Sequence, residues 1–315
     1  MSSTIDDHPA GPASGPVVAS TRDELRAARE SLTSRDVAVV MTMGALHDGH
    51  AQLVRRARAE HDHVIVTIFL NPLQFGPKED LSRYPRTFDA DMAICTDAGV
   101  DIVFAPTPDV IYPDGDPGVR VSAGPLGTVL EGQSRPGHFD GMLTVVGKLL
   151  HLSAARTAYF GQKDAQQLLL IRRMVRDLDF LVDVVAVPTV REEDGLAMSS
   201  RNTYLTESDR EVALCLSRAL QAGADAAAYG PSAIRRGARE VLVEEPLALV
   251  DYLVLVHPTT LSDVPEWYRG EALLAVAARV GTTRLIDNTP VLVGPGGGRL
   301  DVFSPETTAA SAPIR

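Results

Sequence analysis

The sequence has few cysteines, no long apolar run and no signal peptide, the features that are typical of secreted, zinc-binding or membrane-spanning proteins. Only two cysteines occur among its 315 residues, Cys95 and Cys215, and they lie far apart with no second pair at metal-ligand spacing. Neither a disulfide framework nor a zinc knuckle is expected, and a reducing cytoplasm fits this cysteine usage best. No apolar run approaches the roughly 20 residues that a membrane helix needs. The start, MSSTIDDHPAGPASG, also lacks the charged and apolar regions of a signal peptide. We therefore expect a cytoplasmic protein that has no membrane partner.

Positive charge is also scarce. The chain has 30 Lys and Arg against 41 Asp and Glu, a formal net charge of −11 at pH 7. Such a field repels the phosphates of nucleic acid, so no nucleic-acid partner is expected, and any site for an anion must be local. Hydrophobic content of 45% and charged content of 23% are typical of a globular protein. The length predicts one large domain and one smaller domain.

The spacing of apolar residues divides the folded part in two. Short apolar runs alternate with segments of helical period, and the strand candidates are 36–40, 63–70, 101–105, 157–160 and 181–187. The helix candidates between them are 51–60, 88–99, 141–152 and 165–178. This alternation is typical of an α/β fold, and it predicts a Rossmann-like, doubly wound parallel sheet over residues 18–188 with helices on both faces.

The pattern changes after residue 188. Two helical stretches, 207–228 and 232–243, precede three apolar strand candidates at 250–256, 272–280 and 283–288. Helices followed by consecutive strands predict a smaller C-terminal α+β domain, a lid, over residues 189–293. The ends of the chain, 1–17 and 294–315, are rich in small and polar residues and are predicted to be flexible tails.

The first predicted strand runs directly into MTMGALHDGH, residues 41–50. In an open parallel sheet, ligands bind beyond the carboxyl ends of the strands. Gly44 and Gly49 allow close backbone approach, and a helix that starts near His50 would point its free N–H groups at a phosphate. His47 and His50 could act as imidazolium donors to the charge that builds up on phosphorus and on leaving pyrophosphate. Two histidines that only cap a helix are the alternative. A zinc pair is not indicated, because His-Glu-x-x-His is absent.

Two further segments place polar groups after strands. Asn71 and Gln74 follow the second strand in NPLQFG, and their amides could hold a hydroxyl and a carboxylate without adding charge. Lys163 lies in FGQKD at the start of a predicted helix, where a lysine could meet phosphate. Gln167 lies one helical turn after Asp164, so the two side chains could face one pocket. A solvated Lys-Asp pair is the alternative for this segment.

Two polar loops complete the set of candidates. The segment 198–201, MSSR, supplies two hydroxyls and a guanidinium that could close over a triphosphate. The glycine-rich stretch 127–139 could be a mobile cover that excludes water from a site. Ordinary surface loops are the alternative for both.

Taken in order, these segments resemble a known family. The turn His47-Asp48-Gly49-His50 resembles the HIGH signature of a nucleotidyltransferase superfamily. Its combination with four further segments resembles the pantothenate synthetase family. These are FLNPLQFG (69–76), YPRT (84–87), FGQKDAQQ (160–167) and VREEDGLAMSSRN (190–202). The resemblance covers about residues 37–202 and extends more weakly to TTRLIDN near residue 285.

This resemblance implies an ATP-dependent ligase that condenses (R)-pantoate with β-alanine through a pantoyl-adenylate, releasing AMP and pyrophosphate. It implies catalytic roles for His47, His50, Lys163 and Arg201. It implies ATP binding by Met43, Gly44, His47, Gly49, His50, Gly161, Gln162, Lys163, Asp164, Val190, Met198, Ser199, Ser200 and Arg201. It implies binding of pantoate or β-alanine by Asn71, Gln74, Glu131, Arg135, His138 and Gln167.

The same resemblance implies that ATP is a substrate, that Mg²⁺ accompanies it, and that the protein forms a homodimer. The stretch 88–91 departs from the adjacent acidic residues often seen in the family, which leaves Asp89 and Asp91 as the candidate magnesium ligands. Mg²⁺ is commonly held by nucleotide phosphates and water, so an all-protein cage is not required.

Three other functions remain to be distinguished. A nucleotidyltransferase for another acceptor, such as a cytidylyltransferase or a fragment of an aminoacyl-tRNA synthetase, shares the H-x-G-H turn, although the negative charge disfavours tRNA. A non-catalytic nucleotide-binding protein would not need both histidines, Lys163 and the Ser-Ser-Arg segment. A dehydrogenase is disfavoured because no G-x-G-x-x-G follows the first strand.

Overall fold

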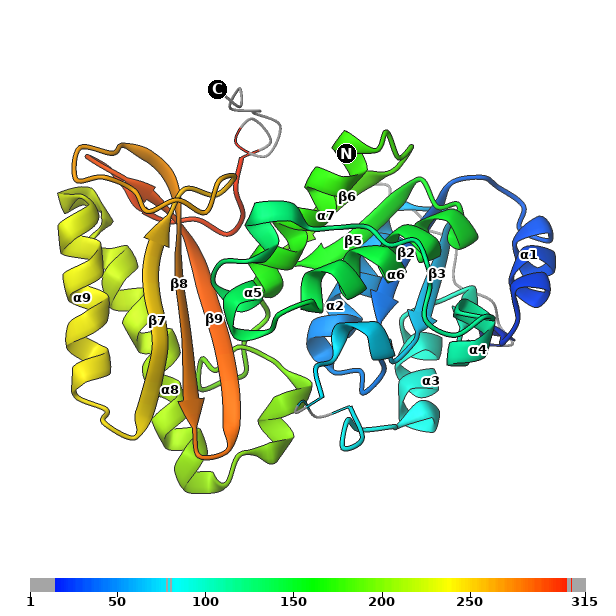
Figure 1. Ribbon diagram of the computed structural model, residues 1–315, viewed down its shortest axis with the longest axis horizontal. Helices are drawn as coiled ribbons and strands as arrows, with labels where there is room; N and C mark the ends of the chain where they lie inside the picture. Colours follow the sequence, from blue (N-terminus) through cyan, green and yellow to red (C-terminus); the bar gives the residue numbers. More distant parts are fainter. Residues whose placement is uncertain (1–14, 78, 80, 305–306, 308–315) are drawn as a thin grey trace, which may run out of the picture. The chain divides into compact units, whose positions relative to one another are not determined.

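The computed structural model describes residues 15–77, 79, 81–304 and 307, and the chain divides into two compact units (Figure 1). Unit 1 comprises Met1–Thr128, Gly132–Phe160 and Leu170–Val187. Unit 2 comprises Val129–Glu131, Gly161–Leu169 and Pro188–Arg315. Two short pieces of the predicted N-terminal domain 18–188 therefore belong to unit 2, a feature that the sequence pattern does not indicate.

Unit 1 is built on a six-stranded sheet. Its elements, in whole or in part, are β1 (Val17–Ala19), α1 (Arg22–Glu30), β2 (Val37–Thr42), α2 (Asp48–Glu60), β3 (His63–Ile68), η1 (Pro72–Gln74), α3 (Phe88–Asp97), β4 (Ile102–Phe104), α4 (Pro108–Ile111), η2 (Gly124–Gly127), α5 (Glu131–Ser134), α6 (His138–Ser153), β5 (Thr157–Gly161), α7 (Ala165–Asp177) and β6 (Asp183–Val187). The strand order is β1-β4-β3-β2-β5-β6, with parallel pairing from β1 to β5.

Both faces of this sheet are covered by helices. Side chains from alternate positions of β2 and β3, such as Val40 and Val66, share one buried cluster with Val54 of α2 and Cys95 of α3. Since successive strand residues point to opposite faces, the equally buried Val39 faces the other side, where α1 and α6 pack together. The chain order reverses between β2 and β5, so the predicted doubly wound, Rossmann-like fold is confirmed and its switch point lies between these two strands.

Unit 2 is a smaller α+β arrangement. Its elements are η3 (Gln162–Asp164), η4 (Ser200–Tyr204), α8 (Glu207–Asp225), η5 (Ala227–Tyr229), α9 (Pro231–Val243), β7 (Ala248–Val256), β8 (Gly270–Val280), β9 (Thr283–Val293) and β10 (Gly298–Arg299). The strands form an antiparallel sheet in the order β10-β9-β8-β7, and α8 and α9 pack against it over one apolar core (Figure 1). The predicted helix 207–228 ends earlier, at Asp225, and a short η5 follows it.

The chain ends differ from the predicted tails. Residues 1–14 lie outside the described part, but Val17 already belongs to β1, which pairs with β4. Helix α1 was not predicted from the sequence, although Thr21 and Glu24 form a capping box at its start and Thr-x-x-Glu is a known helix-start pattern. The predicted C-terminal tail begins too early at residue 294, because Gly298 and Arg299 pair with β9. Within the described residues, no helix is long and apolar enough to cross a membrane.

Candidate active site

The turn after β2 is locked by its two histidines. His47 is the N-cap of α2, and its Nδ1 accepts a hydrogen bond from the backbone N–H of Gly49 at 3.1 Å. The Nδ1 of His50 accepts from the backbone N–H of His47 at 3.3 Å, and the ring centroids lie 4.1 Å apart. A ring nitrogen that accepts carries no proton, so in this arrangement each ring bears its proton on Nε2. Imidazolium donors were predicted from the sequence; in this arrangement each ring presents Nε2–H, while its Nδ1 caps the helix.

The backbone just before these histidines is held by Asp91. Its carboxylate, 1% exposed, accepts hydrogen bonds from the backbone N–H groups of Ala45 at 3.1 Å and Leu46 at 2.8 Å. The hydroxyl of Thr87 donates to the same carboxylate at 2.9 Å. Gly44 has φ +84°, and a Cβ there would lie 3.1 Å from Asp91 Oδ2, so the turn needs glycine at this position. Asp91 therefore positions the turn, a role that sequence reasoning missed.

Gln74 is connected to the same turn. Its amide nitrogen lies 3.0 Å from the sulfur of Met43, and its amide oxygen accepts from Asn71 at 3.0 Å. The Asn71 amide also donates to the carbonyl of Gly141, and its oxygen accepts from the hydroxyl of Tyr112 at 2.9 Å. Asn71 is thus a buried support, whereas Gln74 is brought next to the histidine turn through Met43.

Arg135 and His138 hold the backbone of Gln74. His138 Nδ1 donates to the Gln74 carbonyl at 2.7 Å, which leaves its Nε2 to accept from Arg135 at 3.0 Å. Arg135 also forms a two-point pair with Glu79. Burial alone would raise the pKa of Glu79, but the hydrogen bonds and charge of Arg135 outweigh it and lower the pKa. Unit 1 therefore brings together Met43, Asn71, Gln74, Arg135 and His138.

The FGQKD segment is part of unit 2. Lys163 lies in η3, is partly buried, and its ammonium group forms no ion pair with the described residues. Asn288 of β9 donates from its side-chain amide to the carbonyls of Gln162 at 3.2 Å and Lys163 at 2.6 Å. Asp164 is exposed. The backbone of this segment is thus fixed, while the lysine side chain remains available.

The neighbouring Gln166, which is not among the predicted site residues, has a structural role. Gln166 accepts from the backbone N–H of Glu131 at 3.1 Å and donates to the carbonyl of Val129 at 2.9 Å. Gln167, a predicted ligand-binding residue, is partly buried and its amide has no hydrogen bond with the described residues. The first turn of α7 thus has one glutamine holding the chain and one still able to bind a ligand.

Glu131 is strongly engaged inside unit 2. Arg284 donates to its two carboxylate oxygens at 2.7 and 2.8 Å, and the hydroxyl of Tyr252 donates at 2.9 Å. Burial raises the pKa of Tyr252, and the nearby Glu131 carboxylate raises it further, so the hydroxyl stays a donor at neutral pH. Both oxygens of Glu131 have partners, which favours a positioning role over direct contact with pantoate or β-alanine.

The segment 190–202 folds back on itself in unit 2. Arg191 and Ala197 form an isolated antiparallel β-bridge, and the N–H of Met198 donates to the Val190 carbonyl at 3.0 Å. Ser199 then caps the short η4 by accepting from the backbone N–H of Arg201. The four residues of the MSSR segment, 198–201, are all partly buried. The hydroxyl and guanidinium groups of MSSR therefore start from a defined loop.

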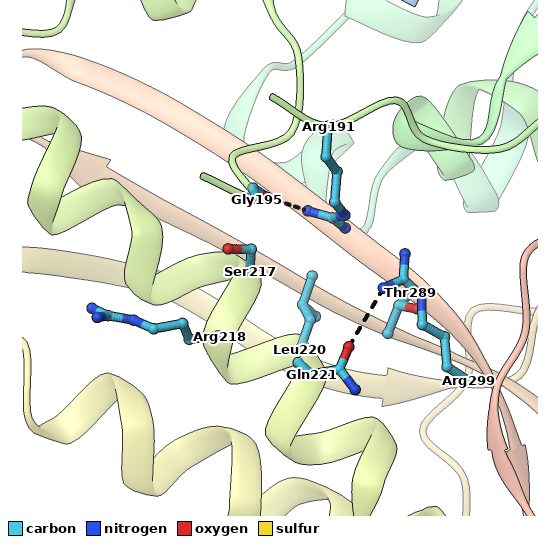
Figure 2. Close-up of a pocket in the computed structure, with 8 residues that line it drawn as sticks. All are labelled: Arg191, Gly195, Ser217, Arg218, Leu220, Gln221, Thr289 and Arg299. Atoms are coloured by element: carbon cyan, nitrogen blue, oxygen red, sulfur yellow. Dashed lines mark hydrogen bonds between the residues drawn. The ribbon is translucent and has the colours of Figure 1, made fainter. Parts of the chain in front are cut away.

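A pocket of about 220 Å³ lies beside this loop in unit 2 (Figure 2). Its lining residues are Arg191, Gly195, Ser217, Arg218, Leu220, Gln221, Thr289 and Arg299. None of the selected site residues lines it, so this pocket does not represent the predicted nucleotide site.

Asp89 and Asp91 are not arranged to hold a magnesium ion. In the described part of the chain, no group of three or more His, Cys, Asp or Glu side chains could hold a metal. Both oxygens of Asp91 are already occupied by the turn, and Asp89 is exposed at the start of α3. No step of the reaction is therefore assigned to a metal bound by these two residues.

Comparison with known proteins identifies the family. The model of the pantoate-beta-alanine ligase family matches residues 17–290. The chain belongs to this family. It is 53% identical over 309 residues to the pantothenate synthetase of Streptomyces avermitilis, covering 82% of this chain and 93% of that protein. It is 56% identical over 285 residues to the enzyme of Thermobifida fusca, covering 88% and 96%. Both relatives are named pantothenate synthetase, and their identity to this chain exceeds 50%. The protein is therefore an enzyme of this ligase family.

Solved structures agree with this membership. The pantothenate synthetase of Thermus thermophilus superposes with a TM-score of 0.82 at 49% identity, covering 86% of this chain and 98% of that one. The pantoate-beta-alanine ligase of Francisella tularensis, solved with beta-gamma ATP and beta-alanine, superposes with a TM-score of 0.72 at 34% identity, covering 87% and 97%. The fold of this ligase is therefore that of the family over nearly its whole described length.

Proposed function

We propose that this ligase condenses (R)-pantoate with β-alanine in two steps. The pantoate carboxylate attacks the α-phosphorus of ATP, forming pantoyl-adenylate and releasing pyrophosphate. The amine of β-alanine then attacks the activated carbonyl carbon, loses a proton, and displaces AMP as the C–N bond of pantothenate forms. The ATP and β-alanine in the Francisella tularensis relative support these two substrates.

The observation that carries this proposal is the pair of histidines at the start of α2. Each Nδ1 accepts from a backbone N–H, so each ring is held in place with its proton on Nε2. Donors that are fixed before the reaction stabilise developing charge without a reorganisation cost. We assign His47 and His50 to the charge that moves onto pyrophosphate, with Lys163 and Arg201 as further cationic contacts to the phosphates.

The remaining groups suit the other substrates. Gln74 and Gln167 present amides that can bind the hydroxyls and carboxylate of pantoate without adding charge. Asn71, Arg135 and His138 act through Gln74, whose backbone and side chain they hold. We assign Mg²⁺ to the phosphates of the ATP substrate. The homodimer, the cytoplasmic location and the absence of a nucleic-acid partner remain predictions from the sequence.

An omission assay tests the reaction. Isotope exchange between pyrophosphate and ATP should require pantoate but not β-alanine, and AMP should accumulate in multiple turnovers only when both are present. Exchange that needs β-alanine, or that proceeds with other carboxylic acids and not with pantoate, would refute the adenylation of pantoate and favour a nucleotidyltransferase with another acceptor.

A histidine variant tests the site. His50→Ala should slow pyrophosphate release by roughly 100-fold or more, because its contact strengthens as charge builds, with a smaller change in substrate affinity. His151→Ala, an exposed histidine on α6, is the control and should keep the wild-type rate. A wild-type rate of pyrophosphate release in His50→Ala would remove His50 from the chemistry.

A further inference from the structure

The TRLIDN segment at the start of β9 contains polar residues that the proposed reaction does not use. Asp287 and Asn288 are only 3% and 5% exposed, at the middle of the strand. Buried polar groups are costly unless they are bound to partners. Their partners, and those of Arg284 on the same strand, therefore indicate what the segment does.

Asn288 holds the segment that carries Lys163. Its amide nitrogen donates to the carbonyls of both Gln162 and Lys163, at 3.2 and 2.6 Å. These carbonyls belong to η3, which has three residues and too few internal hydrogen bonds to fix its own position. The direction in which the Lys163 side chain leaves the backbone consequently depends on Asn288.

Asp287 holds the base of the 190–202 segment. Its two oxygens pair with Arg191 at 2.7 and 3.0 Å, and Arg191 also donates to the carbonyl of Gly195 at 3.1 Å. Figure 2 shows this guanidinium turned toward Gly195. The same segment continues into Ser199 and Arg201, so its base is fixed by a side chain of β9.

Arg284 holds the third segment. Its two-point pair with Glu131 fixes residues 129–131, to which Gln166 at the start of α7 is hydrogen-bonded on both sides. Because Gln166 precedes Gln167 in the first turn of α7, the pair of Arg284 and Glu131 also helps to fix the position of Gln167. Three side chains of one strand thus bind three separate segments that carry predicted ligand-binding residues.

The strand itself is paired throughout with its neighbour. β9 pairs with β8 along its whole length, from Thr283 opposite Val280 to Val293 opposite Gly270. Arg284 and Asn288 lie on one face of β9 and Asp287 on the other, because side chains alternate along a strand. A fully paired strand offers fixed points from which all three segments can be held in constant relation.

We propose that Arg284, Asp287 and Asn288 are positioning residues for the ligase reaction: they fix the segments that present Lys163, Arg201 and Gln167, and do not touch substrate. This inference rests on the proposed function, in which Lys163 and Arg201 contact the phosphates of ATP. A small displacement of such groups slows a reaction strongly while leaving the protein folded.

A double-mutant cycle tests the link from Asn288 to Lys163. Asn288→Ala should lower the rate of pantoate-dependent pyrophosphate release by about 10-fold, and Lys163→Ala by about 100-fold. Because Asn288 acts through Lys163, the double variant should be no slower than Lys163→Ala alone. Effects that multiply in the double variant would overturn the proposal. An unchanged rate in Lys163→Ala would instead refute the proposed role of Lys163, so the two failures are distinguishable.

Hydrogen exchange in the ligand-free protein provides a readout that does not depend on activity. Asn288→Ala should speed amide exchange in residues 161–166 and leave 190–202 unchanged, whereas Asp287→Asn should do the reverse. If both variants loosen all segments equally, the residues stabilise the unit as a whole and the proposal is wrong.

The third contact has a matched control. Arg279 lies directly opposite Arg284 in the ladder, is exposed, and forms no ion pair with the described residues. Arg284→Met should speed exchange in residues 129–131 and lower kcat more than it changes the KM for ATP, while Arg279→Met should do neither. This pair also serves as the test if Asn288→Ala does not fold, and equal behaviour of the two arginine variants would overturn the proposal.

Discussion

The carboxylate of Asp91 lies 2.8 Å from the backbone nitrogen of Leu46, although the two residues are 45 positions apart in the sequence. This contact joins the first turns of α3 to the turn that carries His47 and His50. The position of the histidines is therefore set by a side chain from the next helix, and not by the turn alone.

Replacing Asp91 should loosen this turn. Asp91→Ala leaves the backbone N–H groups of Ala45 and Leu46 without acceptors, so we expect a loss of about 2 to 3 kcal/mol in the free energy of unfolding. Urea denaturation measures it. Asp89→Ala is the matched control: its side chain is exposed on the same helix, and it should change stability by less than about 0.5 kcal/mol. A shifted magnesium requirement in Asp89→Ala would show that this carboxylate binds the ion after all.

Two glycines of α6 should respond to alanine in opposite directions. A Cβ on Gly141 would overlap the carbonyl group of Leu73, next to Gln74, so Gly141→Ala should cost about 2 to 4 kcal/mol and raise the KM for pantoate. At Gly147 the nearest atoms would be 3.6 Å away, and Gly147→Ala should stabilise the helix by about 0.5 to 1 kcal/mol. Thermal melting of both variants checks the difference, and two changes of the same sign would contradict this packing.

The pair of Arg135 and Glu79 should contribute to stability in a defined pH range. Because the pKa of Glu79 is lowered from its usual 4.5 in the folded state, the contribution is present above 4.5 and is lost as the pH falls through the lower folded value. Melting temperatures of Glu79→Gln should therefore fall less steeply with acid than those of the wild type below pH 4.5. If the melting temperatures of the two proteins fall equally with pH below 4.5, the pair contributes nothing to stability.

The two cysteines should be inert in the native protein. Burial raises the pKa of the Cys95 thiol to about 12 and that of Cys215 to about 11, with nearby Asp91 and Glu245 adding to the respective shifts. Only the thiolate reacts, so neither thiol should be labelled by an aromatic disulfide reagent at pH 8 until denaturant is added. Rapid labelling before unfolding would show that one of the cysteines becomes exposed.

The sequence predicted the elements that carry a clear period and missed those defined by long-range contacts. Alternation of strands and helices predicted β2 to β6. The HIGH-like turn predicted that His47 and His50 lie at the start of a helix that follows the first strand of the predicted sheet. In contrast, β1 has only three residues, too few to show a period, and it is a strand because it pairs with β4.

The missed residues have a common physical cause. Gln166 looks like its neighbour Gln167, and only the fold shows that one binds residues 129–131 while the other does not. Asp287 and Asn288 lie in a segment that the sequence predicted only as a strand, and their partners lie far away in the sequence. A sequence shows that a buried polar group needs a partner, whereas the partner is determined by tertiary structure.

The place of β9 in the chain has a consequence for synthesis. A ribosome makes every residue predicted to contact ATP or pantoate before it makes Arg284, Asp287 and Asn288. Until this strand has emerged and paired with β8, the nascent protein contains all the chemical groups of the ligase but lacks the contacts that hold three of its segments. Catalytic competence should consequently appear late and abruptly during translation, after the parallel sheet is already complete.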